Sequence, residues 1–302
     1  MKRLIVIGGP TASGKTNLAI NLAKHFNTQI VSADSRQVFR EMPIGTAQPT
    51  AAQLSEVKHH LIANISVEEP FTANLFALTA SDILENEIFT SNDVAIVVGG
   101  TGLYIKSLLL GLDDLPDIDT HIRNQVQLLY QQNGITWLQE EIKKIDPVYF
   151  QSCDIYNVRR LTRALEVYFS TGNPISVYFN KPKKNLLPKD CKISAYWIDT
   201  ERNTLYHQIN ERVEQMLSDG LLDEVRGLLQ FRTLNALNTV GYSELFDYFD
   251  GKCSLTEASN LIKQHTRNYA KRQITWFRHQ PDFAPISLTT AFQTILQHNE
   301  LQ

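Results

Sequence analysis

The chain has 302 residues, of which 43% are hydrophobic and 20% are charged, a composition that excludes a wholly disordered protein. At about 150 residues per domain, this length predicts two domains. Lysine and arginine number 29 and aspartate and glutamate 32, a formal net charge of −3 that excludes a general polycation, so nucleic acid could be bound only by local basic patches.

The first predicted strand, Leu4–Ile7, follows the charged residues Lys2 and Arg3 and stops at a pair of glycines. A charged start before an apolar run resembles a signal peptide, but this run is too short and leads directly into a turn. The other apolar runs are also shorter than a membrane-spanning helix requires. We therefore expect no membrane partner.

Strands and helices alternate in the first third of the chain. After Leu4–Ile7, the spacing of leucine and alanine predicts a helix over Asn17–His25, and the apolar run Gln29–Ala33 predicts a second strand. Val94–Val98 predicts a third strand, and Leu103–Leu110 predicts a helix. This alternation indicates a parallel sheet with right-handed crossovers, in which ligands bind beyond the carboxyl ends of the strands.

The segment Gly9–Thr16 fits the pattern G-x-x-x-x-G-K-[ST], directly after a predicted strand and before a predicted helix. The backbone N–H groups of such a loop stabilise oxyanions at the positive end of the helix. We expect Lys15 to neutralise terminal phosphates and Thr16 to hold Mg²⁺ through its hydroxyl. A glycine-rich turn without a ligand is the less favoured alternative. The prediction is an α/β fold with a P-loop NTPase-like parallel sheet core flanked by helices.

Asp34 and Thr101 follow the other two predicted strands. The strand Val94–Val98 ends in Gly-Gly-Thr-Gly, where hydrolytic and kinase P-loop proteins normally have an acidic Mg²⁺ ligand. Asp34 could be a Mg²⁺ ligand, a base facing the acceptor of a transferred group, or a cap on a turn, and we favour the base. Thr101 would bring a hydroxyl and an N–H to the same cleft, although a tight turn that needs positive φ also explains its glycines.

A change of composition after residue 110 predicts a second domain. Gly111–Asp119 is an acidic loop, His121–Phe169 has a helical pattern, and Asn180–Lys192 is rich in proline and lysine, as a linker is. Ile193–Ile198 resumes a strand pattern. We therefore predict a helical insertion over residues 116–188, set into a core of residues 1–115 and 189–302 whose part 205–279 is helical.

Two basic clusters lie on predicted helices. The first is formed by Arg159, Arg160 and Arg163, and the second lies within residues 258–281, which contain no acidic residue. Arginine beside aromatic rings suits splayed RNA bases, but a charged run is also what a solvated helix face shows, so spacing leaves both interpretations open. The second cluster comprises Lys263, Arg267, Lys271, Arg272 and Arg278, with Tyr269, Trp276 and Phe277 between them.

In this order, the motifs resemble those of the tRNA dimethylallyltransferase family (tRNA isopentenyltransferases), bacterial type, over nearly the whole chain. Phe39 stands where a tyrosine is expected, and the zinc finger of some eukaryotic relatives is absent, in agreement with three scattered cysteines. The matching segments are Gly9–Thr16, Asp34–Ser35, Met42–Ala47, His59–Ile62, Gly99–Tyr104, Arg159–Tyr168, Val240–Tyr242 and Lys271–Arg278.

The resemblance implies transfer of a dimethylallyl group from dimethylallyl diphosphate to N6 of the adenosine 3′ to the anticodon of tRNA. It implies Mg²⁺ as cofactor, held by Thr16, and a P-loop that grips the diphosphate of the prenyl donor, which explains the missing second acidic strand end. The implied catalytic residues are Asp34 as base, Thr101 as its companion, and Lys15. Carried over by position, the diphosphate-binding residues are Gly9, Thr11, Ala12, Ser13, Gly14, Lys15, Thr16 and Arg212, and the contacts to the anticodon stem-loop are Asp34, Ser35, Arg36, Gln37, Thr101, Arg123, Arg159, Arg160, Arg163, Gly241, Tyr242, Lys271, Arg272 and Arg278.

Three other functions remain as alternatives: an adenylate isopentenyltransferase acting on free AMP or ADP, a P-loop kinase or NTPase, and a non-catalytic RNA-binding module. The three cysteines are odd in number and form no C-x-x-C pair, which fits a reducing cytoplasm. We expect a monomer, and we expect the helical insertion to contact the anticodon stem.

Overall fold

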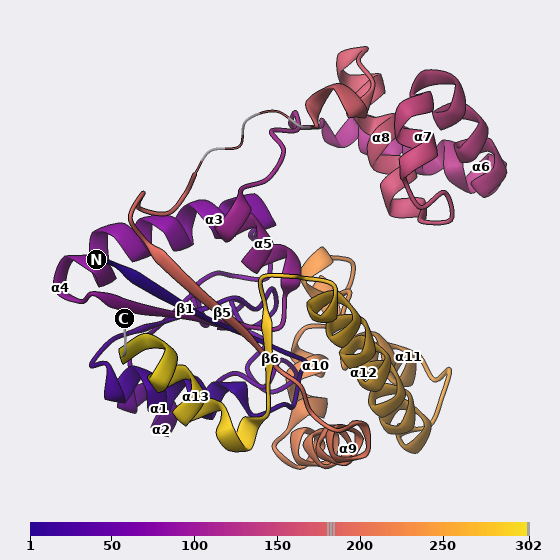
Figure 1. Ribbon diagram of the computed structural model, residues 1–302. Coiled ribbons are helices and arrows are strands. Elements are labelled where there is room, and N and C mark those ends of the chain that lie inside the picture. The colour runs from indigo at the N-terminus through magenta and orange to yellow at the C-terminus, as the bar shows by residue number, and fades with distance from the viewer. Residues whose placement is uncertain (180, 182, 184, 301–302) are drawn as a thin grey trace. The chain divides into compact units, whose positions relative to one another are not determined.

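Six parallel strands form one sheet in the computed structural model (Figure 1). The structure describes residues 1–179, 181, 183 and 185–300. The predicted parallel sheet is confirmed, and two short edge strands, β3 and β6, are added that the hydrophobic pattern did not indicate. In the order β3-β2-β4-β1-β5-β6, the strands are Arg3–Gly8 (β1), Ile30–Ser32 (β2), His59–His60 (β3), Val94–Gly99 (β4), Lys192–Ile198 (β5) and Ala284–Ile286 (β6).

Both faces of the sheet are covered by helices. Successive side chains of a strand point to opposite faces, so Leu4 and Val6 of β1 pack on one side and Ile5 and Ile7 on the other. The first side is covered by α3 (Ala73–Asp82), the π-helical turn η1 (Ile83–Ile88) and α5 (Gly102–Leu110). The short helix α4 (Phe89–Ser91) adds Phe89 to the core of this first side. The second side is covered by α1 (Lys15–His25) and α13 (Leu288–Glu300), and the short helix α2 (Ala51–Glu56) contacts α1.

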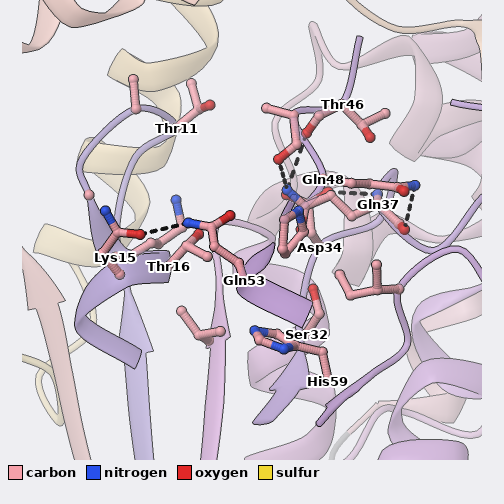
Figure 2. A pocket seen from close by; sticks show the side chains of 18 of the residues that line it. Thr11, Lys15, Thr16, Ser32, Asp34, Gln37, Thr46, Gln48, Gln53 and His59 are labelled. Carbon is pink, nitrogen blue, oxygen red and sulfur yellow. Dashed lines mark hydrogen bonds between the residues drawn. The ribbon is translucent and has the colours of Figure 1, made fainter. Parts of the chain in front are cut away.

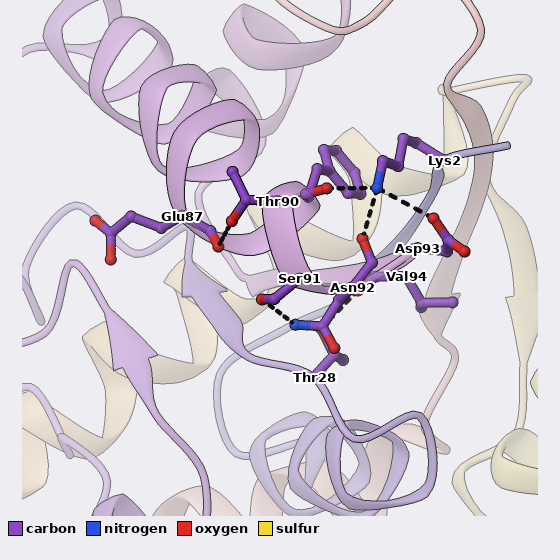
Figure 3. A network of polar contacts seen from close by, with 9 residues as sticks. Lys2, Thr28, Glu87, Thr90, Ser91, Asn92, Asp93 and Val94 are labelled. Carbon is purple, nitrogen blue, oxygen red and sulfur yellow. Dashed lines mark hydrogen bonds and ion pairs between the residues drawn. The ribbon is translucent and has the colours of Figure 1, made fainter.

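The amino ends of β1 and β4 are fixed by a network around Lys2 (Figure 3). The Lys2 ammonium donates to the Phe89 carbonyl, to the Asn92 carbonyl at 3.0 Å and to the Asp93 carboxylate at 3.1 Å. Lys2 belongs to the charged opening of the chain, and here it holds the start of β1 against the segment before β4. The carboxyl ends of the same strands lie at the opposite end of the sheet, measured along the strands.

A layer of helices follows β5 and packs on the segment after β2. Val38, Phe39 and Met42 are buried against it. The helical character predicted for residues 205–279 is confirmed. The helices are α9 (Arg202–Ser218), α10 (Leu221–Gly227), the 3₁₀ turns η3 (Leu229–Phe231) and η4 (Asn235–Leu237), α11 (Ser243–Phe249) and α12 (Leu255–Arg278).

Residues 111–184 form a compact unit separate from residues 1–110 and 185 onward. The predicted insertion, 116–188, begins five residues later and ends four residues later than this unit (116 against 111, and 188 against 184). Asn180, Pro182 and Lys184, in the predicted linker, lie outside the described residues, as do Leu301 and Gln302. The helices are α6 (Thr120–Ile145), α7 (Pro147–Ser152), α8 (Val158–Thr171) and the 3₁₀ turn η2 (Ile175–Tyr178).

This unit has its own apolar core. Val126 and Leu138 of α6 pack with Leu161 and Leu165 of α8, and Gly134 interrupts α6 with a φ of 75°, a left-handed conformation that glycine adopts without strain. Of the helices that the structure describes, none is long and apolar enough to cross a membrane.

Candidate functional site

A cavity of about 250 Å³ lies at the carboxyl ends of β1, β2 and β4 (Figure 2). Ligands of parallel sheets bind beyond the carboxyl ends of the strands, so the cavity lies where the sequence predicts a ligand. In Figure 2, Lys15 and Thr16 lie on one side of the cavity, and Asp34, Gln37 and Thr46 on the other. The lining residues are Thr11–Asn17, Ser32, Asp34, Gln37, Thr46–Pro49, Gln53, His59, Ile62, Val98, Gly99 and Arg212.

The P-loop leads from β1 straight into α1. Gly9 and Gly14 have φ angles of 146° and 79°, which glycine tolerates best, and Ala12 has a φ of 65°. Helix α1 begins at Lys15, so the N–H groups of its first turn and the positive end of its dipole lie beside the cavity. The loop is braced by the Ser13 hydroxyl, which donates to the Pro10 carbonyl at 2.8 Å. This geometry suits an anion.

Two cations add to this positive potential. The Lys15 ammonium donates to the Pro10 carbonyl at 2.8 Å, and the Arg212 guanidinium of α9 donates to the Thr11 hydroxyl at 3.3 Å. Burial lowers the pKa of Lys15 to about 8, an effect that Asp34 opposes and Arg212 reinforces. Burial also lowers the pKa of Arg212. Two desolvated cations face one carboxylate, so the cavity has an excess of positive charge that favours an anionic ligand.

Asp34 faces these cations across the cavity. Its Oδ1 atom accepts hydrogen bonds from the backbone N–H groups of Arg36 at 2.9 Å and Gln37 at 3.3 Å. Asp34 therefore caps a turn, which is one of its three predicted roles, and it also lines the cavity. The turn fixes the direction of the carboxylate.

Thr101 lies next to the Asp34 turn. Its hydroxyl accepts a hydrogen bond from the Ser35 N–H at 3.0 Å, and its own N–H donates to the Ala33 carbonyl at 3.2 Å. Tyr269 of α12 also lies here: burial raises its pKa to about 12, the charge of Asp34 contributes to the rise, and a hydrogen bond with Thr101 opposes it. Asp34 lines the cavity, whereas Thr101 and Tyr269 lie behind it and outside the lining residues.

The glycines around Thr101 serve packing. Gly99, Gly100 and Gly102 lie outside the left-handed region, so the turn does not need them for positive φ. A Cβ on Gly99 would lie 2.1 Å from the Ala33 carbonyl oxygen. On Gly100 or Gly102 it would lie 2.2 Å or 2.3 Å from a side chain of α12, Gln273 or Trp276 respectively. Close approach of β2 and α12 therefore explains this sequence better than a turn or a ligand does.

The predicted RNA-contacting residues are found in different places. Gln37 lines the cavity, and its amide donates to the Thr46 carbonyl at 3.1 Å and the Ala47 carbonyl at 2.9 Å. The Arg36 guanidinium donates to the Asn238 carbonyl at 3.5 Å. In the unit 111–184, Arg163 is half-buried and donates to the Pro116 carbonyl at 3.2 Å. The exposed members of the set are Arg123, Arg159, Arg160, Lys271, Arg272 and Arg278.

The basic stripe on α12 is divided. Lys263 pairs with Glu214 of α9, and Arg267 donates to Asn210 of α9 at 2.7 Å. These two cations therefore hold α12 against α9. Lys271 is the exposed member of the four-residue repeat, and its Nζ lies over the Tyr206 ring of α9, 5.9 Å from the ring centroid. An apolar groove beside it is lined by Lys271, Arg272, Thr275, Trp276, His279 and Gln280.

Tyr242 was predicted as an RNA contact, and its side chain is instead fully buried. The hydroxyl donates to the Glu224 carboxylate at 2.6 Å, and burial together with that charge raises the pKa of Tyr242. Glu224 also accepts from the N–H groups of Ile44 at 2.7 Å and Gly45 at 2.9 Å. Tyr242 is therefore part of the support for the loop that carries Thr46. Gly241 is likewise buried, its N–H donating to Glu244 at 2.8 Å.

The sequence also gave no role to several residues of the site. His59, the first residue of the edge strand β3, lines the cavity, and its Nδ1 lies 2.8 Å from the Val57 carbonyl. Burial lowers its pKa, which favours a neutral ring, and its Nε2 is buried without a hydrogen-bond partner among the described residues. Gln48, Gln53 and Thr46 complete the polar wall. Thr46 and His59 lie in the segments Met42–Ala47 and His59–Ile62, whose resemblance to the family motifs was the sequence feature that could have identified them.

The donor set allows Mg²⁺ with bound waters. Thr16 and Asp34 bring a hydroxyl and a carboxylate to the cavity. Among the described residues, no group of three or more His, Cys, Asp or Glu could hold a metal ion. Mg²⁺ keeps several waters and takes one or two protein oxygens together with phosphate oxygens, so these residues fit that cation when a phosphate ligand is bound.

Comparison with known proteins gives consistent matches. A family model described as IPP transferase matches residues 37–280. The tRNA dimethylallyltransferase of Christiangramia forsetii is 46% identical over 281 residues, which cover 92% of this chain and 91% of that protein. The crystal structure of the tRNA isopentenylpyrophosphate transferase from Bacillus halodurans has a TM-score of 0.70 at 33% identity and covers 99% of this chain and 95% of that chain. A eukaryotic dimethylallyltransferase acting on tRNA has a TM-score of 0.79 at 25% identity, covering 100% of this chain and 78% of that chain.

Proposed function

This chain belongs to the IPP transferase family, and on that premise we propose that it transfers the dimethylallyl group of dimethylallyl diphosphate to N6 of the adenosine 3′ to the anticodon (position 37) of tRNA. One observation carries the proposal: the cavity has Lys15, Arg212 and the start of α1 on one side and a fixed carboxylate, Asp34, on the other. The cationic side can bind an anionic leaving group, and the carboxylate can accept the proton that the nucleophile loses.

The residues suit a direct displacement. N6 attacks C1 of the donor, the bond between C1 and the diphosphate oxygen breaks, and the diphosphate leaves with the electron pair. Asp34 accepts the proton that N6 loses, a contribution of about 10²–10⁴-fold when typical. Lys15, Arg212 and the N–H groups of the P-loop bind the charge that grows on the diphosphate. Thr101 keeps the Asp34 turn in place through Ser35.

We propose Mg²⁺ as the cofactor, with Thr16 as the protein ligand. When bound, Mg²⁺ neutralises diphosphate oxygens and makes the diphosphate a better leaving group. Lys15 and Arg212 supply charge to the same group from the protein.

For the acceptor we propose the single-stranded anticodon loop of tRNA, bound by a monomer in the cytoplasm. The adenosine must leave its stack to reach the cavity, which costs about a few kcal/mol and is offset by contacts to the loop. The exposed cations Lys271 and Arg272 on α12 and Arg159 and Arg160 on α8 are suited to phosphate contacts. We also propose that the unit 111–184 binds the anticodon stem.

A transfer assay tests the proposal. The protein is incubated with Mg²⁺ and labelled dimethylallyl diphosphate, together with unmodified tRNA or with AMP. We expect label on tRNA, removed when the adenosine 3′ to the anticodon is replaced by guanosine. Label on AMP alone would assign the chain to the adenylate isopentenyltransferases. Release of phosphate from ATP, without prenyl transfer, would assign it to the kinases or NTPases, and RNA binding alone would make it a binding module.

The variant Lys271→Ala should weaken tRNA binding about 3- to 10-fold and lower the slope of log affinity against log salt by about 0.7–0.9, because one phosphate contact is lost. The rate of transfer from the bound complex should stay within about twofold of wild type. Lys263→Ala is the matched control, since it removes the same charge from the same helix at a position that pairs with Glu214. Equal losses in both variants, or a loss confined to turnover, would contradict the assignment of Lys271.

A further inference from the structure

A single buried amide joins the two loops that frame the cavity. Gln273 of α12 is 6% exposed. Its Oε1 accepts a hydrogen bond from the Thr11 N–H of the P-loop at 2.9 Å, and its Nε2 donates to the Gly100 carbonyl, in the loop after β4, at 2.9 Å. The two partners, one donor and one acceptor, fix the orientation of the amide, because a flipped amide would oppose both groups.

The helix that carries Gln273 is seated for this contact. Gln273, Trp276 and Phe277 lie on one face of α12, three and four residues apart. A Cβ on Gly100 would lie 2.2 Å from the Gln273 amide nitrogen, and a Cβ on Gly8 would lie 2.2 Å from the Phe277 ring. Glycines at the ends of two neighbouring strands, β1 and β4, therefore let one face of α12 approach closely enough for the amide to reach both loops.

Each bonded loop carries one half of the proposed chemistry. Thr11 belongs to the loop whose helix begins at Lys15, and its hydroxyl accepts from Arg212. Gly100 precedes Thr101, which accepts from the Ser35 N–H beside Asp34. Besides the pairing of β1 with β4 in the sheet, Gln273 therefore provides a second, side-chain connection from the cationic side of the cavity to the loop next to the carboxylate. On either side of it in the chain are Arg272, which is exposed, and Ile274.

We propose that Gln273 is a positioning residue that sets the separation between the P-loop and the loop after β4, whose Thr101 holds the Asp34 turn, and that transfer depends on this separation. The inference rests on the proposed function. Displacement requires the acceptor nitrogen, C1 and the leaving oxygen to be aligned, and a shift of about 1 Å in one partner can cost about 10²-fold in rate. Gln273 itself touches no reacting atom and acts through the two loops.

Two substitutions separate this role from simple packing. Gln273→Met keeps the size of the side chain and loses both hydrogen bonds. Gln273→Glu can restore both, but only as the neutral acid, whose carbonyl accepts from Thr11 and whose hydroxyl donates to Gly100. As a carboxylate it places negative charge against the Gly100 carbonyl. Burial raises the pKa of such a carboxyl group toward neutral pH. The control is Gln264→Met, an exposed position on the same helix.

Single-turnover transfer is measured with saturating donor and tRNA from pH 6 to pH 9, and each rate is divided by the wild-type rate at the same pH, which cancels the titration of groups that the variants share with the wild type, such as Lys15. We expect the ratio for Gln273→Glu to fall about tenfold or more with rising pH, the ratio for Gln273→Met to be low and flat, and the ratio for Gln264→Met to stay near one. Thermal unfolding is followed in parallel. Lower unfolding temperatures with transfer ratios near one and flat would overturn the inference.

Binding of inorganic pyrophosphate, without RNA, keeps the inference and the proposed function apart. If Gln273 holds the P-loop, Gln273→Met should bind pyrophosphate about 3- to 10-fold more weakly than wild type, and Gln273→Glu should do so only at high pH. If the wild type transfers no prenyl group but these binding changes are found, the proposed function is rejected and the positioning role of Gln273 is kept. If the wild type transfers the prenyl group while the rate ratios and the pyrophosphate affinities of the variants are unchanged, only the positioning role is rejected.

Discussion

Asp34→Asn is expected to lower the single-turnover rate of prenyl transfer to tRNA by about 10²–10⁴-fold. An asparagine oxygen can still accept from the N–H groups of Arg36 and Gln37, so the turn that Asp34 caps is preserved while the proton acceptor is lost. The affinity for tRNA should remain within about twofold, because the carboxylate acts on the reacting nitrogen. Rapid-quench measurements of transfer and filter binding of tRNA give the two quantities.

Asp34→Ala is the companion variant. It loses the acceptor for both turn N–H groups as well as the base, so it should show the same loss of rate together with a lower unfolding temperature. If Asp34→Asn transfers the prenyl group at a rate within a few-fold of wild type while Asp34→Ala is inactive, then Asp34 acts by capping the turn and is not the catalytic base.

Lys15→Met is expected to lower kcat/KM for dimethylallyl diphosphate by about 10²–10³-fold. The ammonium lies at the start of α1 and is one of two half-buried cations that line the cavity, so its loss leaves Arg212 to bind the departing diphosphate. The unfolding temperature should not fall, because the variant removes a desolvated charge. Steady-state kinetics with tRNA held constant and thermal unfolding provide the two measurements.

The lowered pKa of Lys15 adds a pH dependence. With a pKa of about 8, the ammonium is present below pH 8 and is progressively lost above it. We therefore expect kcat/KM for the donor to fall above about pH 8 in the wild type. Lys15→Arg keeps a cation throughout this range, so its profile should lose that alkaline limb whatever its absolute rate. An unchanged alkaline limb in Lys15→Arg would show that another group titrates.

The residues that sequence analysis identified best are those fixed by local geometry. The spacing within Gly9–Thr16 is that of a P-loop, so its placement between β1 and α1 could be predicted from eight residues. Asp34 was identified for a similar reason, since it directly follows a predicted strand.

Residues whose role depends on distant packing were not assigned correctly. Tyr242 is buried in an apolar core, where Glu224, 18 residues earlier, accepts hydrogen bonds from its hydroxyl and from the backbone of Ile44 and Gly45. Gln273 reaches Thr11 across 262 positions of sequence. On α12, the period of four placed Lys263 and Arg267 on one face but could not show that α9 covers it.

The position of β1 in the sheet constrains how the chain is made. It pairs with β4 on one side and with β5 on the other, and residues 100–191 lie between β4 and β5 in the chain. On the ribosome, at about 5–20 residues per second, synthesis of those residues takes roughly 5 to 18 s. During that interval the nascent chain can pair β1 with β4 but must leave its other edge open, where unpaired backbone groups invite aggregation or chaperone binding.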